Sequence, residues 1–310
     1  MTENLLQPAD RVEVTVLVDN YIDIFVPPAT SVDHRLPFDP VRTLLAEHGL
    51  SCLVRVFSGK NEHAILLDAG LSGDCLFHNT RQMELDLSKV EAVVLSHGHF
   101  DHTGGLVDFF HGATRQIPLV LHPDAFLRRR INNPARVPVD LPSPDAVTLK
   151  KAGADLQQRE GPSTLAAGHL LVTGQVERKT PFEKGLPGME AWTGDHWTAD
   201  PVRDDQAIVI DVKGKGLIVI SGCAHAGIIN TVEYAKQITG VETVHAVMGG
   251  FHLTGPAFEP VIVPTISGMK QINPVYVVPM HCTGWSAINR FSREMPGKFI
   301  LNTVGTTYRF

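Results

Sequence analysis

The hydrophobic and polar positions of the first hundred residues predict a group of β-strands. Residues 12–18 alternate and are rich in β-branched side chains, and residues 51–57 and 63–67 repeat this signal around a turn at residues 59–61. Residues 90–95 form a continuous apolar run, which is typical of a strand covered on both faces. We therefore expect a sheet that begins antiparallel and continues with a fully buried strand.

After this strand the pattern changes to a loop and a short helix. Gly104 and Gly105 loosen the backbone, and the apolar content of residues 106–110 suits a helix packed on the sheet. Residues 118–121 predict a further strand, followed by a helix that ends at Phe126.

Two later segments carry no regular pattern. Residues 132–144 are rich in proline, and residues 179–203 mix glycine and proline with aromatic side chains. The second segment forms either a lid or pocket wall or a packed surface loop. We expect one domain over residues 1–310, with loop-built cap regions near residues 126–160 and 179–203.

The last third of the chain predicts parallel strands. Residues 206–212 and 216–220 flank a Lys-Gly-Lys turn and form a hairpin signal. Helices and strands then alternate, with helices at 228–238 and 264–271 and strands at 243–247 and 275–279. Such strands end at one edge of a sheet. We therefore expect His225, His252 and His281, which follow these strands, to lie together at that edge.

Composition and charge describe a globular, mildly acidic chain. Of the 310 residues, 43% are hydrophobic and 19% charged, and the net charge is −6. This charge argues against nucleic acid or an anionic membrane as the partner. The compact basic run Arg128–Arg130 favours an exposed helix face, with phosphate binding as the alternative.

The cysteines and the N-terminal residues predict a compartment. Cys52, Cys75, Cys223 and Cys282 are scattered, which argues against a disulfide framework or a zinc ribbon. Residues 1–11 lack the apolar stretch of about 7 to 15 residues that a secretory signal needs. No apolar run reaches the roughly 18 residues of a membrane span. We expect a cytoplasmic protein.

The strongest chemical signal is the run of His97, His99, Asp101 and His102. One tight loop can direct the first pair to one metal ion and the second pair to another, about 3.5 to 4 Å away. Imidazole and carboxylate together suit Zn, Mn or Fe. The alternative is a polar loop whose histidines only form hydrogen bonds.

Four ligands do not complete two coordination shells, so further ligands are needed. His225 and His281 are the best candidates because each follows an apolar strand. His252 shares this placement and either contacts substrate or orients another ligand, and His169 is a weaker candidate. Cys223 and Cys282 neighbour the proposed ligands; a thiolate binds Zn well, but a buried thiol is the commoner fate.

The segment Ser-His-Gly-His-Phe-Asp-His-Thr-Gly-Gly-Leu at residues 96–106 resembles the signature of the metallo-β-lactamase superfamily. Asp205-Gln206-Ala207 and the segments at 221–228, 249–253 and 279–284 resemble one branch of it. That branch is often labelled 7,8-dihydropterin-6-methyl-4-(β-D-ribofuranosyl)-aminobenzene-5'-phosphate synthase-like. The resemblance runs from Asp19-Asn20 to the C-terminus.

The resemblance implies an α/β fold, a four-layer αββα sandwich with two metals in the cleft between its sheets. His97 and His99 would bind the first metal, Asp101 and His102 the second, and His281 matches the superfamily's last histidine motif. The chain departs from the pattern at Cys223, where many relatives have a bridging aspartate. Either Cys223 or His225 then completes the shell.

These features favour a metal-dependent hydrolase that acts on a small, anionic ester, phosphoester or lactone. One or two Zn ions, or Mn or Fe, would activate a water that Asp101 positions and helps to deprotonate. His225 or His252 would stabilise the developing charge. The residues predicted to bind substrate are His252, Asn20, Arg178 and Trp192. The expected partner is a small molecule, and a homodimer is possible.

Three other functions stay open. The branch label suggests a transferase that joins a pterin methyl group to an arylamine ribofuranosyl phosphate, with an aromatic slot built from Tyr21, Phe182, Trp192 and Trp197. The same fold also hosts iron-dependent oxidoreductases. A binding protein with a lapsed site is disfavoured by the intact histidine run. The fold alone does not decide among these.

Overall fold

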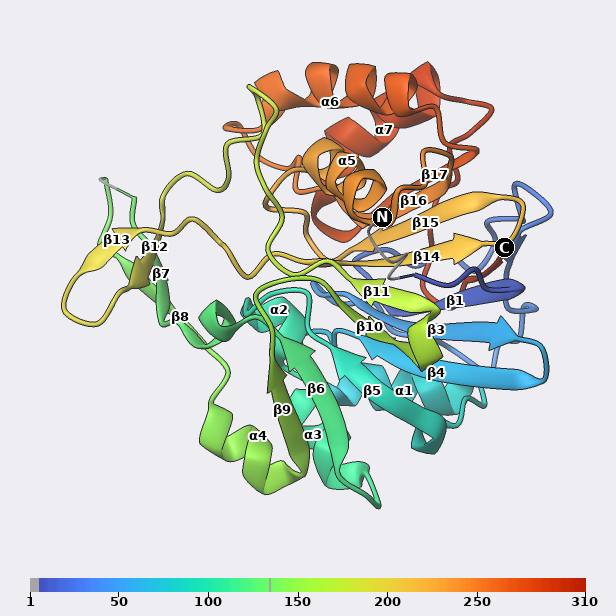
Figure 1. Ribbon diagram of the computed structural model, residues 1–310, viewed down its shortest axis with the longest axis horizontal. Coiled ribbons are helices and arrows are strands. Elements are labelled where there is room, and N and C mark those ends of the chain that lie inside the picture. Colours follow the sequence, from blue (N-terminus) through green and yellow to red (C-terminus); the bar gives the residue numbers. More distant parts are fainter. Residues whose placement is uncertain (1–5, 134) are drawn as a thin grey trace.

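The computed structural model describes residues 6–133 and 135–310, which form two large sheets (Figure 1). In spatial order, the first sheet contains β2 (Asp33–His34), β18 (Thr307–Arg309), β1 (Arg11–Val18), β3 (Ser51–Ser58), β4 (Asn61–Leu67), β5 (Val90–Val94), β6 (Ile117–Leu121) and β9 (Ala154–Gln158). The second contains β10 (Ser163–Leu165), β11 (Leu170–Val172), β14 (Ala207–Val212), β15 (Gly216–Ser221), β16 (Val244–Gly250) and β17 (Tyr276–Met280).

Helices cover the outer face of each sheet. Below the first sheet in Figure 1 lie α1 (Gly73–Gln82), α3 (Leu106–Gly112) and α4 (Ala146–Ala152), and above the second lie α5 (Ile228–Thr239), α6 (Glu259–Ile272) and α7 (Trp285–Glu294). The short α2 (Phe100–Thr103) and the 3-10 turns η1 (Leu87–Lys89), η2 (Pro123–Phe126), η3 (Ala166–Gly168) and η4 (His281–Thr283) connect these elements. The predicted αββα sandwich is confirmed.

Strand β15 shows how the sequence produces these layers. All six of its residues are buried. Ile218 and Ile220 pack into the core between the two sheets, whereas Leu217 and Val219 pack into the core beneath the helices. Because side chains alternate along a strand, a continuous apolar run is what a strand with two covered faces requires. Each such side chain contributes about 1.5–3 kcal/mol on burial.

Most predicted elements are found near their predicted positions. β14 and β15 form the predicted hairpin, and β15, β16 and β17 pair in parallel. The helix predicted to end at Phe126 is only the 3-10 turn η2. No helix in the described part of the chain is long and apolar enough to cross a membrane. All four cysteines are free and buried. The prediction that residues 1–11 carry no secretory signal includes residues 1–5, which lie outside the described residues.

The cap segments are more regular than the sequence predicts. β7 (Arg129–Ile131), β8 (Val139–Leu141), β12 (Met189–Trp192) and β13 (Trp197–Ala199) form a third sheet that projects to the left in Figure 1. The predictions of irregular structure at 132–144 and 179–203 are therefore wrong where these strands lie; residue 134 is outside the described residues. Arginine and tryptophan pairs across the strands hold this sheet, as where Arg130 lies 4.3 Å from the Trp197 ring.

The basic run is not the exposed helix face that was predicted. Arg129 begins β7, is 2% exposed and lies between two buried carboxylates. Its Nε donates to Asp200 and its Nη2 to Asp204, both at 2.7 Å. The other oxygen of Asp204 accepts the backbone N–H of Gly98 at 2.8 Å. Arg129 thus ties the cap sheet to the loop that carries the histidine run.

We predict that Arg129→Met lowers the free energy of unfolding by about 3–5 kcal/mol, because it leaves Asp200 and Asp204 buried without a cation. Denaturant unfolding of the purified protein measures this change. Arg203→Met is the matched control, since Arg203 is 52% exposed in its pair with Asp124 and its loss should cost about 1 kcal/mol or less. Equal losses in both variants would contradict the anchoring role.

Candidate metal centre

The candidate site lies where β4, β15, β16 and β17 end. Just after these strands, Asp68, Ala224, His252 and His281 have positive φ angles of 55°, 51°, 41° and 51°. A left-handed conformation costs a residue with a Cβ roughly 1–2 kcal/mol. Such strain persists only where the surrounding structure enforces it, and it concentrates at functional sites. The strained turns direct side chains from both sheets into one place.

The first cluster consists of three buried imidazoles. The Nε2 of His97 lies 2.9 Å from Nδ1 of His99, and the Nε2 of His225 lies 3.2 and 3.1 Å from these two atoms. Gly98 allows the tight turn between the first two, since a Cβ there would lie 2.0 Å from the carbonyl oxygen of Ala125. The loop therefore directs both histidines of the run toward His225.

The arrangement of these three nitrogens suits coordination of a metal ion better than direct contact among the rings. Burial lowers the pKa of His97, His99 and His225 well below the usual range, so all three are neutral near pH 7. Neutral rings whose lone pairs converge repel one another unless a cation lies between them. Tetrahedral ligands at Zn–N bonds of 2.0–2.1 Å are about 3.3 Å apart, close to the distances found here. The cluster could hold one divalent metal.

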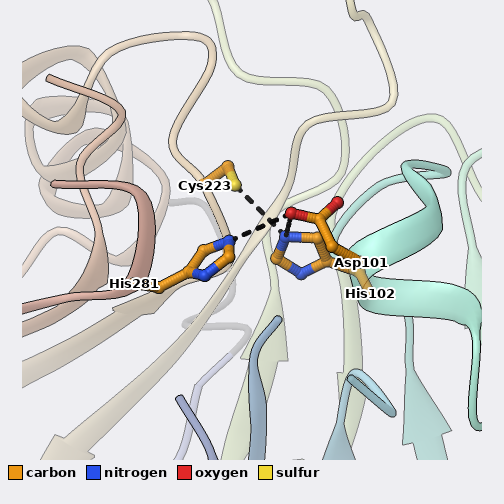
Figure 2. Close-up of side chains that lie close together, drawn as sticks. All are labelled: Asp101, His102, Cys223 and His281. Carbon is orange, nitrogen blue, oxygen red and sulfur yellow. Dashed lines mark hydrogen bonds and ion pairs between the residues drawn. The ribbon is translucent and has the colours of Figure 1, made fainter. Parts of the chain in front are cut away.

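The second cluster adds a carboxylate and a thiol to two imidazoles (Figure 2). The Oδ2 of Asp101 lies 3.4 Å from Nε2 of His281 and 3.9 Å from Nε2 of His102. The Sγ of Cys223 lies 3.1 Å from the same nitrogen of His102. The structure places Cys223 in this cluster and His225 in the first, but Cys223 also groups with His225 and His252, so which of the two completes a metal shell stays a prediction.

Charge distinguishes the second cluster from the first. Burial opposes the ionisation of Asp101, but His102 and His281 outweigh it and hold its pKa below the usual range. Burial also opposes protonation of His102, yet Asp68 and Asp101 raise its pKa to about 9. A metal that binds His102 through Nε2 must therefore displace a proton at neutral pH.

One buried carboxylate, Asp68, orients ligands of both clusters. Its Oδ2 accepts hydrogen bonds from Nδ1 of His102 at 2.6 Å and from the hydroxyl of Ser96 at 2.7 Å. The Ser96 oxygen in turn lies 2.9 Å from Nδ1 of His97. In both histidines the proton is thereby drawn to Nδ1, which leaves the Nε2 lone pair for the cluster.

The pair Asp19 and Asn20 performs the same task for His281. Asp19 accepts a hydrogen bond from the backbone N–H of His281 at 2.8 Å. The Oδ1 of Asn20 accepts a hydrogen bond from Nδ1 of the His281 ring at 2.9 Å. Asn20, predicted to bind substrate, is placed by the structure behind His281. Contact between Asn20 and substrate remains a prediction.

His252 and Cys282 border both clusters. The His252 ring lies 4.4 Å from that of His225, and Sγ of Cys282 lies 3.1 Å from Sγ of Cys223. Beside His225 and His252 is a cavity of about 20 Å³, whose apolar wall includes Phe251 and Phe258. This volume is close to what one water molecule needs.

Two other residues predicted to bind substrate have structural contacts. Arg178 donates from Nη2 to the carbonyl oxygens of Pro201 at 2.6 Å and His225 at 3.3 Å. Trp192 lies on β12 of the projecting sheet, with its ring 5.5 Å from that of Trp197. Their roles toward substrate stay predictions. Of the other arginines singled out by sequence, Arg129 and Arg130 pair with carboxylates of the protein, and Arg128 lies over the rings of Trp192 and Trp197.

Sequence reasoning missed the residues that support the ligands. Asp68 and Ser96 each follow an apolar strand, as the candidate histidines do. The same strand-end signal would have found both, had it been applied to carboxylates and hydroxyls. Arg129 gave no such signal, because its partners Asp200 and Asp204 are more than 70 residues away.

Comparison with known sequences gives consistent results over most of the chain. A family model described as the metallo-beta-lactamase superfamily matches residues 48–236. A Methanocaldococcus jannaschii protein named 7,8-dihydropterin-6-methyl-4-(beta-D-ribofuranosyl)-aminobenzene-5'-phosphate synthase is 31% identical over 269 residues, 86% of this chain and 90% of that protein. An uncharacterised protein of the same organism is 31% identical, covering 85% of this chain and 94% of its own length.

Solved structures show the same fold. A metal-dependent hydrolase of the beta-lactamase superfamily has a TM-score of 0.75 at 24% identity, covering 96% of this chain and 98% of its own. Zn(2+)-bound PqqB from Methylobacterium extorquens has a TM-score of 0.51 at 17% identity, covering 95% of this chain and 99% of that chain. At these identities the likeness concerns the fold alone.

We predict that His99→Ala and His281→Ala each lower the bound metal by about one equivalent, because each removes a ligand from a different cluster. Elemental analysis after loading with Zn and removal of free metal measures the loss. His169→Ala is the control, since His169 is bonded to the carbonyl oxygen of Gln7, away from both clusters. Full metal content in both site variants would show that the clusters are not the ligands.

We also predict that Zn affinity at the second cluster rises with pH. His102, with a pKa of about 9 in the metal-free protein, and the Cys223 thiol, whose pKa burial raises, each lose a proton on binding, so affinity should rise about a hundredfold per pH unit from pH 6 to 8. Asp68→Asn removes the carboxylate that raises this pKa and should flatten the dependence. Chelator competition at pH 6, 7 and 8 measures both slopes; identical slopes would contradict the role assigned to Asp68.

Proposed function

The chain belongs to the metallo-β-lactamase superfamily, and we propose that it is a metal-dependent hydrolase of a small, anionic ester, phosphoester or lactone. The observation that carries the proposal is the pair of adjacent ligand clusters at the ends of strands from two sheets. Three neutral imidazoles form the first cluster, and a carboxylate, a thiol and two imidazoles form the second cluster. The thiols, all free, favour a reducing compartment, so we propose a cytoplasmic location.

We propose that each cluster holds one divalent ion, with Zn as the preferred metal and Mn or Fe as alternatives. His97, His99 and His225 would hold the first, and Asp101, His102, Cys223 and His281 the second. Imidazole and thiolate are the ligands that Zn prefers. A bound divalent ion would supply Lewis acidity and lower the pKa of a coordinated water to about 7.

The protein's own groups would position the reactants. Asp101 stays ionised because of the neighbouring imidazoles, so it is better suited to orient a water by accepting a hydrogen bond than to retain a proton. His252 lies beside His225 at the edge of the cavity, where its ring can donate to an oxygen of the substrate. We assign His225 to the metal of the first cluster. Its buried Nδ1 has no hydrogen-bond partner among the described residues, so this nitrogen could donate to substrate.

The substrate class follows from size and charge. The cavity beside His252 has an apolar wall but holds little more than one water molecule, so most of the substrate would lie outside it. Metal ions in both clusters would attract an anionic oxygen, whereas Glu183 in the cavity wall disfavours a second anionic group there. We therefore propose a substrate with a single anionic group, whose reacting oxygen lies at the clusters, with no nucleic acid or membrane as partner.

One observation favours a second function. The synthase of M. jannaschii is 31% identical over most of both chains. If this chain shares that activity, the clusters would serve a transferase that joins a pterin methyl group to an arylamine ribofuranosyl phosphate. The predicted aromatic slot finds little support in the structure, because Trp192 and Trp197 pack against each other in the projecting sheet.

A screen of the purified protein loaded with Zn, Mn or Fe tests the proposal. We expect hydrolysis of at least one of the phosphodiester, phosphomonoester, lactone and thioester classes, and a loss of about a hundredfold or more in kcat/KM for His99→Ala but not for His169→Ala. If no substrate of any class is hydrolysed, the hydrolase proposal is wrong and the synthase reaction is favoured. Oxygen uptake by the Fe form would instead identify an oxidoreductase.

A further inference from the structure

His48 is an exposed imidazole held against the buried second cluster. Its side chain is 58% exposed, yet its Nε2 lies 3.4 Å from Oδ2 of Asp101, which is only 10% exposed. Its ring centre is 5.2 Å from that of His281. Neither cluster includes His48. It therefore lies at the border between solvent and the proposed metal site.

The backbone on both sides of His48 is fixed. Before it, the backbone N–H of Glu47 donates to the carbonyl oxygen of Asp19 at 3.2 Å, and the Glu47 carboxylate accepts the backbone N–H of Ser72 at 2.9 Å. After it, Gly49 passes so close to Asp101 that a Cβ would lie 2.7 Å from the Asp101 carbonyl oxygen. An exposed histidine on a surface loop usually has no such constraints. Here the chain holds the ring in place beside Asp101.

Asn20 determines which nitrogen of His48 carries the proton. The Oδ1 of Asn20 accepts the backbone N–H of Gly49 at 3.2 Å, so its Nδ2 is the atom that faces Nδ1 of His48, also at 3.2 Å. An amide nitrogen only donates, so Nδ1 of His48 accepts and the neutral ring carries its proton on Nε2. By the same reasoning His281 donates from Nδ1 to Asn20, which leaves its Nε2 free for a metal.

The Nε2–H of His48 is therefore an unused donor. Its 3.4 Å separation from Asp101 exceeds the usual N–H···O range of about 2.7–3.2 Å. We propose that His48 contacts the substrate, donating this hydrogen bond to an anionic phosphoryl or carboxylate oxygen bound at the second cluster. The inference rests on the proposed function, because it requires an anionic group at the metal site.

Binding of inorganic phosphate to the Zn-loaded full chain tests the inference by calorimetry. A hydrogen bond to a charged acceptor corresponds to about a tenfold to hundredfold change in affinity, so His48→Ala should weaken phosphate binding by that factor. His48→Gln, whose amide can donate from a similar place, should recover much of the loss. Zn content should stay unchanged in both. His78→Ala, which replaces a partly buried histidine of α1 whose Nε2 lies 2.7 Å from the carbonyl oxygen of Thr43, is the control.

Asn20→Asp provides a readout that a merely structural role would not change. The aspartate still accepts from Gly49 and His281 but no longer donates to His48. At a pH where the ring is neutral, we expect nitrogen-15 NMR to show the His48 proton on Nε2 in the wild type and on Nδ1 in this variant.

Three results would overturn the inference: unchanged phosphate affinity in His48→Ala, no phosphate binding to the loaded wild type, or loss of Zn from His48→Ala. Failure of the hydrolase proposal is recognised separately. In that case no ester in the screen is hydrolysed, while phosphate binding still depends on His48.

Discussion

The hydrogen bonds of Asp68 are the constraint on which the candidate site depends. This carboxylate is fully buried and accepts from the Ser96 backbone N–H, the Ser96 hydroxyl and Nδ1 of His102. A buried charge is costly unless it is fully hydrogen-bonded, and here each bond also serves the site. Through Ser96 the same carboxylate orients His97, so one group from the first sheet fixes ligands for both proposed ions.

The layered fold supplies the rigidity that this arrangement needs. Strands buried on both faces end at one edge, and the residues that follow them adopt strained, left-handed conformations. Close packing makes such an edge hard to deform, because a shift of one strand would open cavities in two cores. The stability gained from apolar burial in the layers therefore offsets the local cost of directing His252 and His281 inward.

The two clusters differ in charge, and this difference gives them different chemistry. The first is neutral and buried, so it binds a cation without losing protons. The second has an ionised Asp101 and a His102 that is protonated when metal is absent. His48 and Asn20 lie only beside the second cluster. The open, polar side of the site is thus the side of Asp101, and the apolar cavity lies beside His225.

Much of the fold, and the grouping of the candidate ligands, could be predicted from the sequence because both depend on local patterns. Period-two alternation and continuous apolar runs identified β1, β3 to β6 and β14 to β17. The spacing from His97 to His102 identified the loop, since six neighbouring residues are brought together by the chain itself. His225 and His281 followed from the rule that parallel strands end at one edge.

Tertiary structure alone decided the rest, because the remaining contacts join residues far apart in the chain. Asp68 meets His102 across 34 residues, and Asn20 meets His281 across 261. The position of Cys223 beside His102 and of His225 beside His97 depends on the strained turn at Ala224, which no pattern reveals. The sequence by itself determined which residue types and strand ends could build a metal site; only folding decided which of them support it and which face the solvent.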